Sequence, residues 1–187
     1  MSLRSCGLRA AIRSYSTSAV NVIFHTLASV ATAAVLSTQL KEKKPINSTA
    51  GLTILVIGFT TGILLHGLLD WIPHQYPLPS VLDVVVSLIL FSMIFIFAHR
   101  EARWILFACF LGAIFPDLVD LGPAILNRQM QLHLPTVKIF PWHWKEYSGS
   151  IYDGSRRWLS ILNHLVVTGM TGCLILGFRK SLIRNLF

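Results

Sequence analysis

Five apolar runs decide what this chain can fold into. They lie at residues 19–37, 51–72, 81–98, 104–121 and 158–178, and short charged or proline-containing breaks separate the first four. A helix needs about 20 apolar residues to cross the hydrocarbon core of a bilayer. In lipid every backbone polar group must be paired within the protein, which leaves helices as the natural form for such runs. The sequence therefore predicts an all-α, polytopic membrane bundle of about five transmembrane helices.

Composition and charge support a membrane protein and argue against a nucleic-acid-binding one. Hydrophobic residues make up 53% of the 187 residues and charged residues only 13%, whereas about a quarter of a typical soluble domain is charged. The net charge is +8, but the basic residues cluster at the ends of the apolar runs, as juxtamembrane anchors do. The expected partner is thus the lipid bilayer, with no nucleic acid involved.

Two segments lie outside the predicted spans. Residues 1–18 are basic, rich in serine and free of acidic residues, which is the composition of an organelle transit peptide; a bacterial juxtamembrane tail is the alternative. We therefore expect a membrane helical domain at 19–187, in either a bacterial or a mitochondrial inner membrane. Within it, 122–157 is predicted to be a long polar loop, and loops of this length are commonly functional.

The second run ends with an unexpected pair of ionisable residues. His66 and Asp70 are four residues apart, so a helix places them on one face, one turn apart. An ionisable side chain inside a bilayer costs roughly 2.5–3.5 kcal/mol on insertion scales and usually has a partner. The pair therefore predicts further polar groups on neighbouring helices.

The alternating direction of the spans predicts where those partners lie. Successive spans cross the membrane in opposite directions, so the start of an odd-numbered span and the end of an even-numbered span share one side. The other ionisable residues of this kind all fall on that side, namely His25, Asp117, Asp120 and His164. Their convergence predicts a shared site at one leaflet.

Histidine and aspartate at one depth favour a divalent metal site. Imidazole and carboxylate are ligands for zinc, manganese and iron, and a dication offsets the charge of buried aspartates. Zinc is the expected metal, with manganese or iron as alternatives. We expect the metal ligands to be His25, His66, Asp70, Asp117 and His164, and the catalytic residues to be Asp120 and His74, acting as general base or by orienting a ligand. Separate structural roles and a proton relay are the alternatives.

One histidine in the long loop allows two interpretations. His143 lies between Trp142 and Trp144, a pattern typical of the aromatic belt at a membrane interface. Alternatively, the loop brings His143 to the site as a late ligand. In the second span, Gly58 and Gly62 form a GxxxG element, which indicates close helix packing.

The motifs of spans two and four resemble a known family. His66-x3-Asp70 followed by Trp71-Ile72-Pro73-His74, together with the segment 112–120 that contains Asp117 and Asp120, resembles the membrane-bound, metal-dependent hydrolases that include LexA-regulated inner-membrane proteins. The resemblance covers roughly spans one to four and implies metal-dependent hydrolysis without specifying a substrate. His25, His66 with Asp70, and Asp117 with Asp120 match its motif positions. The paired-histidine segment of many members is absent here, and His143 and His164 are the candidates for its role.

The expected function is hydrolysis of an ester or phosphodiester in an amphiphilic substrate near one leaflet. Arg156 and Arg157, just outside the fifth span, either hold a substrate phosphate or anchor the membrane edge. The HExxH protease motif is excluded because Gly67 follows His66, and the chain has no P-loop or GxSxG motif. A small ion- or proton-coupled transporter and a structural membrane subunit are the alternatives.

Overall fold

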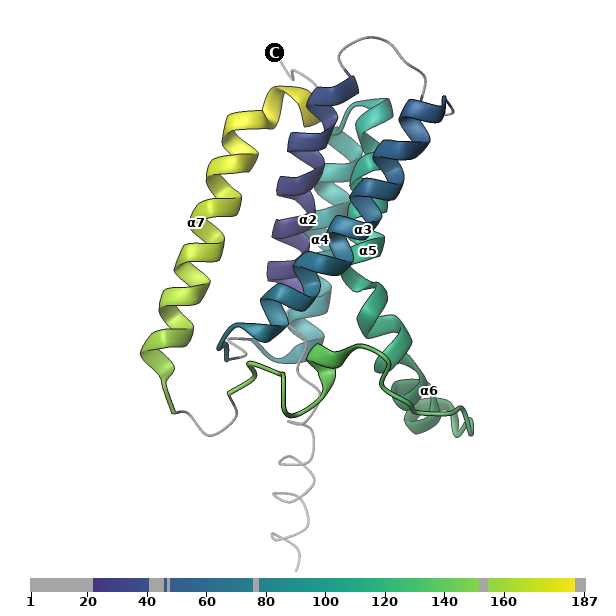
Figure 1. Cartoon of the computed structure of the whole chain (residues 1–187), viewed down its shortest axis with the longest axis vertical. Helices are drawn as coiled ribbons and strands as arrows, with labels where there is room; N and C mark the ends of the chain where they lie inside the picture. Colours follow the sequence, from purple (N-terminus) through teal and green to yellow (C-terminus); the bar gives the residue numbers. More distant parts are fainter. Residues whose placement is uncertain (1–21, 41–45, 47, 76–77, 152–154, 184–187) are drawn as a thin grey trace, which may run out of the picture.

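A computed structural model describes residues 22–40, 46, 48–75, 78–151 and 155–183, and shows a bundle of long helices (Figure 1). The described ranges contain no β-strand, which confirms the predicted all-α bundle. Within these ranges, five helices are long and apolar enough to cross a membrane, as expected of an integral membrane protein. They are α2 (Val22–Leu36), α3 (Thr49–Trp71), α4 (Ser80–Phe97), α5 (Arg100–Asp120) and α7 (Arg157–Leu182). The predicted tail, 1–18, lies outside the described residues.

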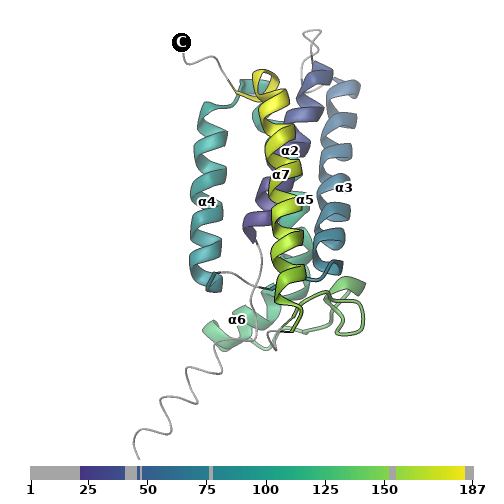
Figure 2. The ribbon, with the colours of Figure 1, turned by 90° about the vertical axis from the view of Figure 1, so that its left-hand side faces the viewer.

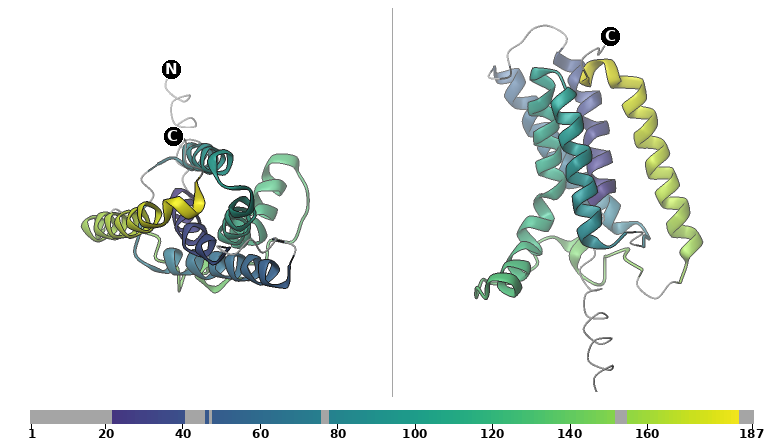
Figure 3. Two further views of the ribbon diagram at one scale, coloured as in Figure 1. Left: turned by 90° about the horizontal axis from the view of Figure 1, so that it is seen from above. Right: turned by 180° about the vertical axis from the view of Figure 1, so that it is seen from behind.

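Helix α2 forms the centre of the bundle. It packs against α3, α4, α5 and α7, and the view from above shows the other helices around it (Figure 3). A short 3-10 helix, η1 (Ser37–Leu40), continues it. Small residues such as Ala31, Ala33 and Ala34 are fully buried on α2, which lets neighbouring backbones approach closely. The central position of α2 brings His25 into the interior of the bundle.

Glycines hold α3 and α5 side by side. A Cβ added to Gly62 would lie 2.5 Å from the carbonyl oxygen of Cys109, and one added to Gly112 would collide with the backbone of Phe59. The GxxxG element therefore acts as expected, by allowing two helix backbones into contact. This close contact places the end of α3, with its histidine and aspartate, beside the end of α5.

Helix ends differ from the predicted spans where charged residues extend a helix. Helix α5 begins at Arg100 rather than at 104, and α7 continues to Leu182 rather than stopping at 178. Hydropathy marks only the apolar part of a helix, whereas arginine side chains can lie along its ends and reach polar groups. Arg103 does so by donating a hydrogen bond of 2.7 Å to the carbonyl of Ile96.

The loop predicted at 122–157 is more structured and less polar than expected. It begins with helix α6 (Gly122–Met130) and contains the 3-10 helix η2 (Pro141–His143). Pro123 lies in the first turn of α6, a position that favours helix initiation. Figures 1 and 2 show α6 leaving the bundle sideways. Its apolar residues Ile125 and Met130 are exposed.

Asp83 on the first turn of α4 is expected to stabilise the start of α2. Its buried carboxylate accepts hydrogen bonds from the backbone N–H groups of Val22 (2.6 Å) and Ile23 (3.4 Å). Asp83→Ala leaves these groups without an acceptor, so we expect a loss of about 1–2 kcal/mol. The measurement is the thermal unfolding midpoint in detergent. Asp83→Asn keeps an acceptor and should lose less; equal losses would contradict the capping role.

Candidate metal centre

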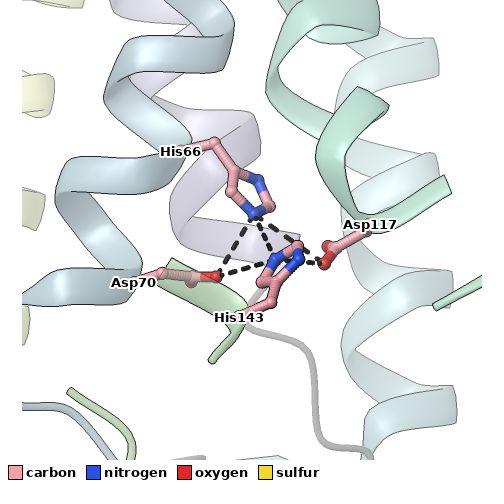
Figure 4. Close-up of side chains that lie close together, drawn as sticks. All are labelled: His66, Asp70, Asp117 and His143. Carbon is pink, nitrogen blue, oxygen red and sulfur yellow. Dashed lines mark hydrogen bonds and ion pairs between the residues drawn. The ribbon is translucent and has the colours of Figure 1, made fainter. Parts of the chain in front are cut away.

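Four potential metal ligands meet at one end of the bundle. His66 and Asp70 come from the end of α3, Asp117 comes from the end of α5, and His143 comes from η2 in the loop (Figure 4). One ligand atom from each lies within 4.8 Å of all the others. Three separate elements therefore direct two imidazoles and two carboxylates at one point.

The separations between these atoms suit tetrahedral metal coordination. Nε2 of His66 is 3.2 Å from Nε2 of His143, 3.2 Å from Asp70 Oδ2 and 3.8 Å from Asp117 Oδ1. Nε2 of His143 is 3.3 Å from each of the two carboxylates. A regular tetrahedron with bonds of about 2.0–2.2 Å, typical of zinc with nitrogen and oxygen ligands, has edges of about 3.3–3.6 Å. Five of the six separations are thus close to these edges, and the remaining one, between the oxygens of Asp70 and Asp117, lies within 4.8 Å, so the four side chains could hold a small cation.

Hydrogen bonds fix which ring nitrogen of each histidine faces the centre. Nδ1–H of His66 donates to the carbonyl oxygen of Ala113 at 2.5 Å, and Nδ1–H of His143 donates to Asp120 Oδ2 at 2.8 Å. Each neutral ring then carries a lone pair on Nε2. Two lone pairs facing each other at 3.2 Å need a proton or a metal ion between them. The arrangement is that of metal-binding histidines held by outer hydrogen bonds.

Asp120 lies behind His143 and orients it. Its Oδ1 accepts from the N–H of Ile139 (2.8 Å), and its Oδ2 accepts from the N–H of Phe140 (2.9 Å) and from His143. The side chain is fully buried, and these three donors occupy both oxygens. Of the two roles predicted for Asp120, this geometry supports orientation of a ligand rather than general-base action.

The electrostatics of His143 favour its charged form in the absence of a metal. Burial opposes that charge, but the carboxylates of Asp117, Asp70 and Asp120 outweigh it and raise the pKa of His143 to about 10. A proton is therefore the natural occupant of the space between the two imidazoles near neutral pH.

Zinc affinity is expected to increase with pH as a result. Because the pKa of His143 is raised, a zinc ion that binds to this ring would have to displace a proton at any pH below about 10. Displacement of one proton predicts an affinity that increases about tenfold per pH unit. Competition titration against a zinc chelator at pH 6.5, 7.5 and 8.5, corrected for protonation of the chelator, measures this. An affinity independent of pH over that range would contradict it.

His25 lies against the four ligands but contacts a different atom. Its ring stacks on that of His66 with centroids 4.1 Å apart, and its Nε2 is 3.3 Å from Asp70 Oδ1, whereas Asp70 Oδ2 faces His66 and His143. Only 2% of His25 is exposed. The two oxygens of Asp70 thus point to two different sets of histidines.

His164 and His74 lie apart from the four ligands. The ring of His164 stacks on Phe24 with centroids 4.3 Å apart. Nδ1–H of His74 donates to the carbonyl of Ile72 (2.8 Å), and its Nε2 is 3.3 Å from Ser150 Oγ. The structure therefore places the predicted ligand His164 and the predicted catalytic residue His74 beside the centre, not within the set of four.

In the set of four potential ligands, His143 is the second histidine beside His66, whereas the sequence predicted His164 as a ligand. The Trp-His-Trp pattern suggested a membrane-interface belt, but the structure brings this segment in under α3. Gly67 makes the approach possible, because a Cβ there would lie 2.6 Å from the ring of Trp142. Gly67 was the feature of the sequence that could have indicated a segment packed closely beside His66. A sequence does not show, however, which segment a glycine faces.

Fold and site together define the class of this protein. It is a multi-pass helical membrane protein with a His/Asp group able to hold a metal ion at one end of the bundle. Comparisons with protein-family models, with curated proteins and with solved structures find no match.

Proposed function

We propose that this protein is a membrane-embedded, metal-dependent hydrolase that cleaves an ester or phosphodiester of an amphiphilic substrate at one leaflet. The observation that carries the proposal is the convergence of His66, Asp70, Asp117 and His143 from three elements. The motif resemblance to membrane-bound, metal-dependent hydrolases adds support. Zinc is the proposed metal, with manganese or iron as alternatives, and a bacterial or mitochondrial inner membrane is the proposed location.

The ligand set suits hydrolytic chemistry. When bound, a divalent metal lowers the pKa of a coordinated water towards neutrality and polarises the group to be cleaved. His66 is closed to solvent, whereas the side chains of Asp70 and Asp117 are 18% and 16% exposed. Water and substrate therefore have access from the carboxylate side. Asp117 has the longest contact of the set, 3.8 Å to His66, and is the carboxylate best placed to accept a proton.

The surroundings suit a substrate with both apolar and anionic parts. Leu68 and Trp71, on the same turns of α3 as the ligands, are 50% and 64% exposed, so the membrane-facing rim is apolar. Beyond the end of α3, a groove of about 570 Å³ is lined by serine hydroxyls and by Arg156. An arginine beside hydroxyl groups is a common way to hold a phosphate, which favours a phosphodiester or phosphate-bearing lipid.

A proton-coupled transporter is the second candidate because His and Asp contacts form a continuous chain. Asp70 links His25 to His143, and His143 links Asp70 to Asp117 and Asp120 at distances of 2.8–3.3 Å. All of these residues lie at one end of the bundle, whereas a relay has to cross the membrane. The hydrolase is therefore the favoured function.

A hydrolysis assay tests the proposal. Detergent-purified protein is stripped of metal, reloaded with zinc or manganese, and given bis(p-nitrophenyl) phosphate, a p-nitrophenyl acyl ester and phospholipid in mixed micelles. We expect metal-dependent cleavage that Asp117→Ala reduces at least 100-fold, with the exposed His133→Ala as the matched control. Equal rates for metal-loaded wild type and Asp117→Ala on all three would exclude the hydrolase. Proton flux in proteoliposomes that Asp70→Asn abolishes would then favour the transporter.

A further inference from the structure

A small cavity lies beside Asp70, on the side of this residue that faces His25. It is enclosed by α2, α3 and α7, and its polar lining consists of His25, Asp70, His74 and His164. Its free space is about 10 Å³, enough for one small species such as a water molecule or a bare ion. Three imidazoles and a carboxylate around so small a space make an unusual lining for the interior of a membrane bundle.

Several nitrogen atoms in this lining lack a hydrogen-bond partner. Both ring nitrogens of the buried His25 and Nε2 of His164 are inaccessible to solvent and make no hydrogen bond among the described residues. A buried polar atom without a partner destabilises the folded protein. His25 Nε2 is 3.3 Å from Asp70 Oδ1, so an unused nitrogen lies beside the carboxylate oxygen that faces away from the first centre. A water molecule or an ion in the cavity would supply a partner for these atoms.

We propose that the cavity holds a second divalent cation, bound by His25, His164 and Oδ1 of Asp70, so that Asp70 bridges two metal ions. This inference rests on the proposed metal centre and extends it. A bridging carboxylate matches the geometry, because Oδ2 of Asp70 faces His66 and His143 while Oδ1 faces His25. Two-metal sites, with ions about 3.5–4 Å apart, are typical of enzymes that cleave phosphate esters.

Charge favours a cation over a water molecule in this cavity. The carboxylates of Asp70, Asp117 and Asp120 surround the first centre, and a single dication leaves one of their negative charges uncompensated. Such a charge is costly in a buried setting. A water molecule would satisfy the histidine nitrogens but would leave the net charge of three carboxylates and one dication at −1. A second dication would change that net charge to +1, which one hydroxide ligand would neutralise.

The number of bound metal ions per chain tests the inference. The protein is purified in detergent without a histidine tag, loaded with zinc, dialysed and analysed by mass spectrometry for metal and protein content. We expect two ions per chain in the wild type and one in His164→Phe, which keeps an aromatic ring stacked on Phe24. His133→Ala, a control for adventitious binding, should retain two.

Manganese provides an independent readout. Two manganese ions bridged by a carboxylate are expected to give an exchange-coupled electron paramagnetic resonance spectrum, and His164→Phe should convert it to the six-line signal of a single ion. His164→Gln replaces His164→Phe if the latter does not fold.

Each outcome separates the two proposals. One ion in both the wild type and His164→Phe, lost in His143→Ala, would overturn the second site and leave the first intact. No bound ion in the wild type would overturn both, whereas a decrease from two to one in His164→Phe alone supports the bridged pair.

Discussion

Asp70→Ala is expected to reduce zinc affinity at least 100-fold, which corresponds to about 2.7 kcal/mol of binding free energy. The side chain of Asp70 lies 3.2–3.3 Å from nitrogens of three histidines, His66, His143 and His25. Its removal takes away one ligand and leaves three neighbouring imidazoles without the negative charge that holds them together. Both losses weaken binding of a cation. Competition titration against a zinc chelator measures the change.

Two further variants make this result specific. Asp70→Asn preserves the shape of the side chain but not its charge, so it should also lose most of the affinity. Glu146→Ala removes an exposed acidic residue elsewhere in the chain and should bind zinc as the wild type does. Wild-type zinc affinity in Asp70→Ala would show that the four ligands do not form a metal centre.

Gly112→Ala is expected to destabilise the bundle by about 1–3 kcal/mol, as overpacking does, and to reduce zinc binding with it. The added Cβ would meet the backbone of Phe59 on α3, and backbone cannot move aside as a flexible side chain can. Separation of α3 from α5 also moves Asp117 away from His66. The measurements are the thermal unfolding midpoint in detergent and the zinc affinity of the same preparation.

Gly169→Ala on α7 is the matched control. A Cβ at this position has no atom within 4 Å, and alanine is intrinsically more favourable than glycine in a helix by about 1 kcal/mol. Gly169→Ala should therefore be neutral or slightly stabilising. Similar behaviour of the two variants would mean that the backbones of α3 and α5 are not in contact at Gly112.

Much of the site was predictable because depth in a membrane follows from position along a helix. The ends of the second and fourth runs had to lie on the same side as the start of the first. The structure places His25, His66, Asp70 and Asp117 accordingly, with His25 against Asp70 and Asp117 near His66. His164 was predicted at the right end of the bundle, but depth alone does not say which helix face it occupies or which neighbours it meets.

Sequence by itself determined the helices and the end of the bundle where the polar residues gather, because hydropathy and alternating direction are local properties of the chain. Tertiary structure decided which residues form the centre. The lateral contact of α3 with α5, made through Gly62 and Gly112, and the path of the loop under Gly67 together bring His143 between Asp70 and Asp117. The position of His143 depends on close packing between segments that are distant in sequence. The hydrophobic periodicity of a single segment carries no information about such packing.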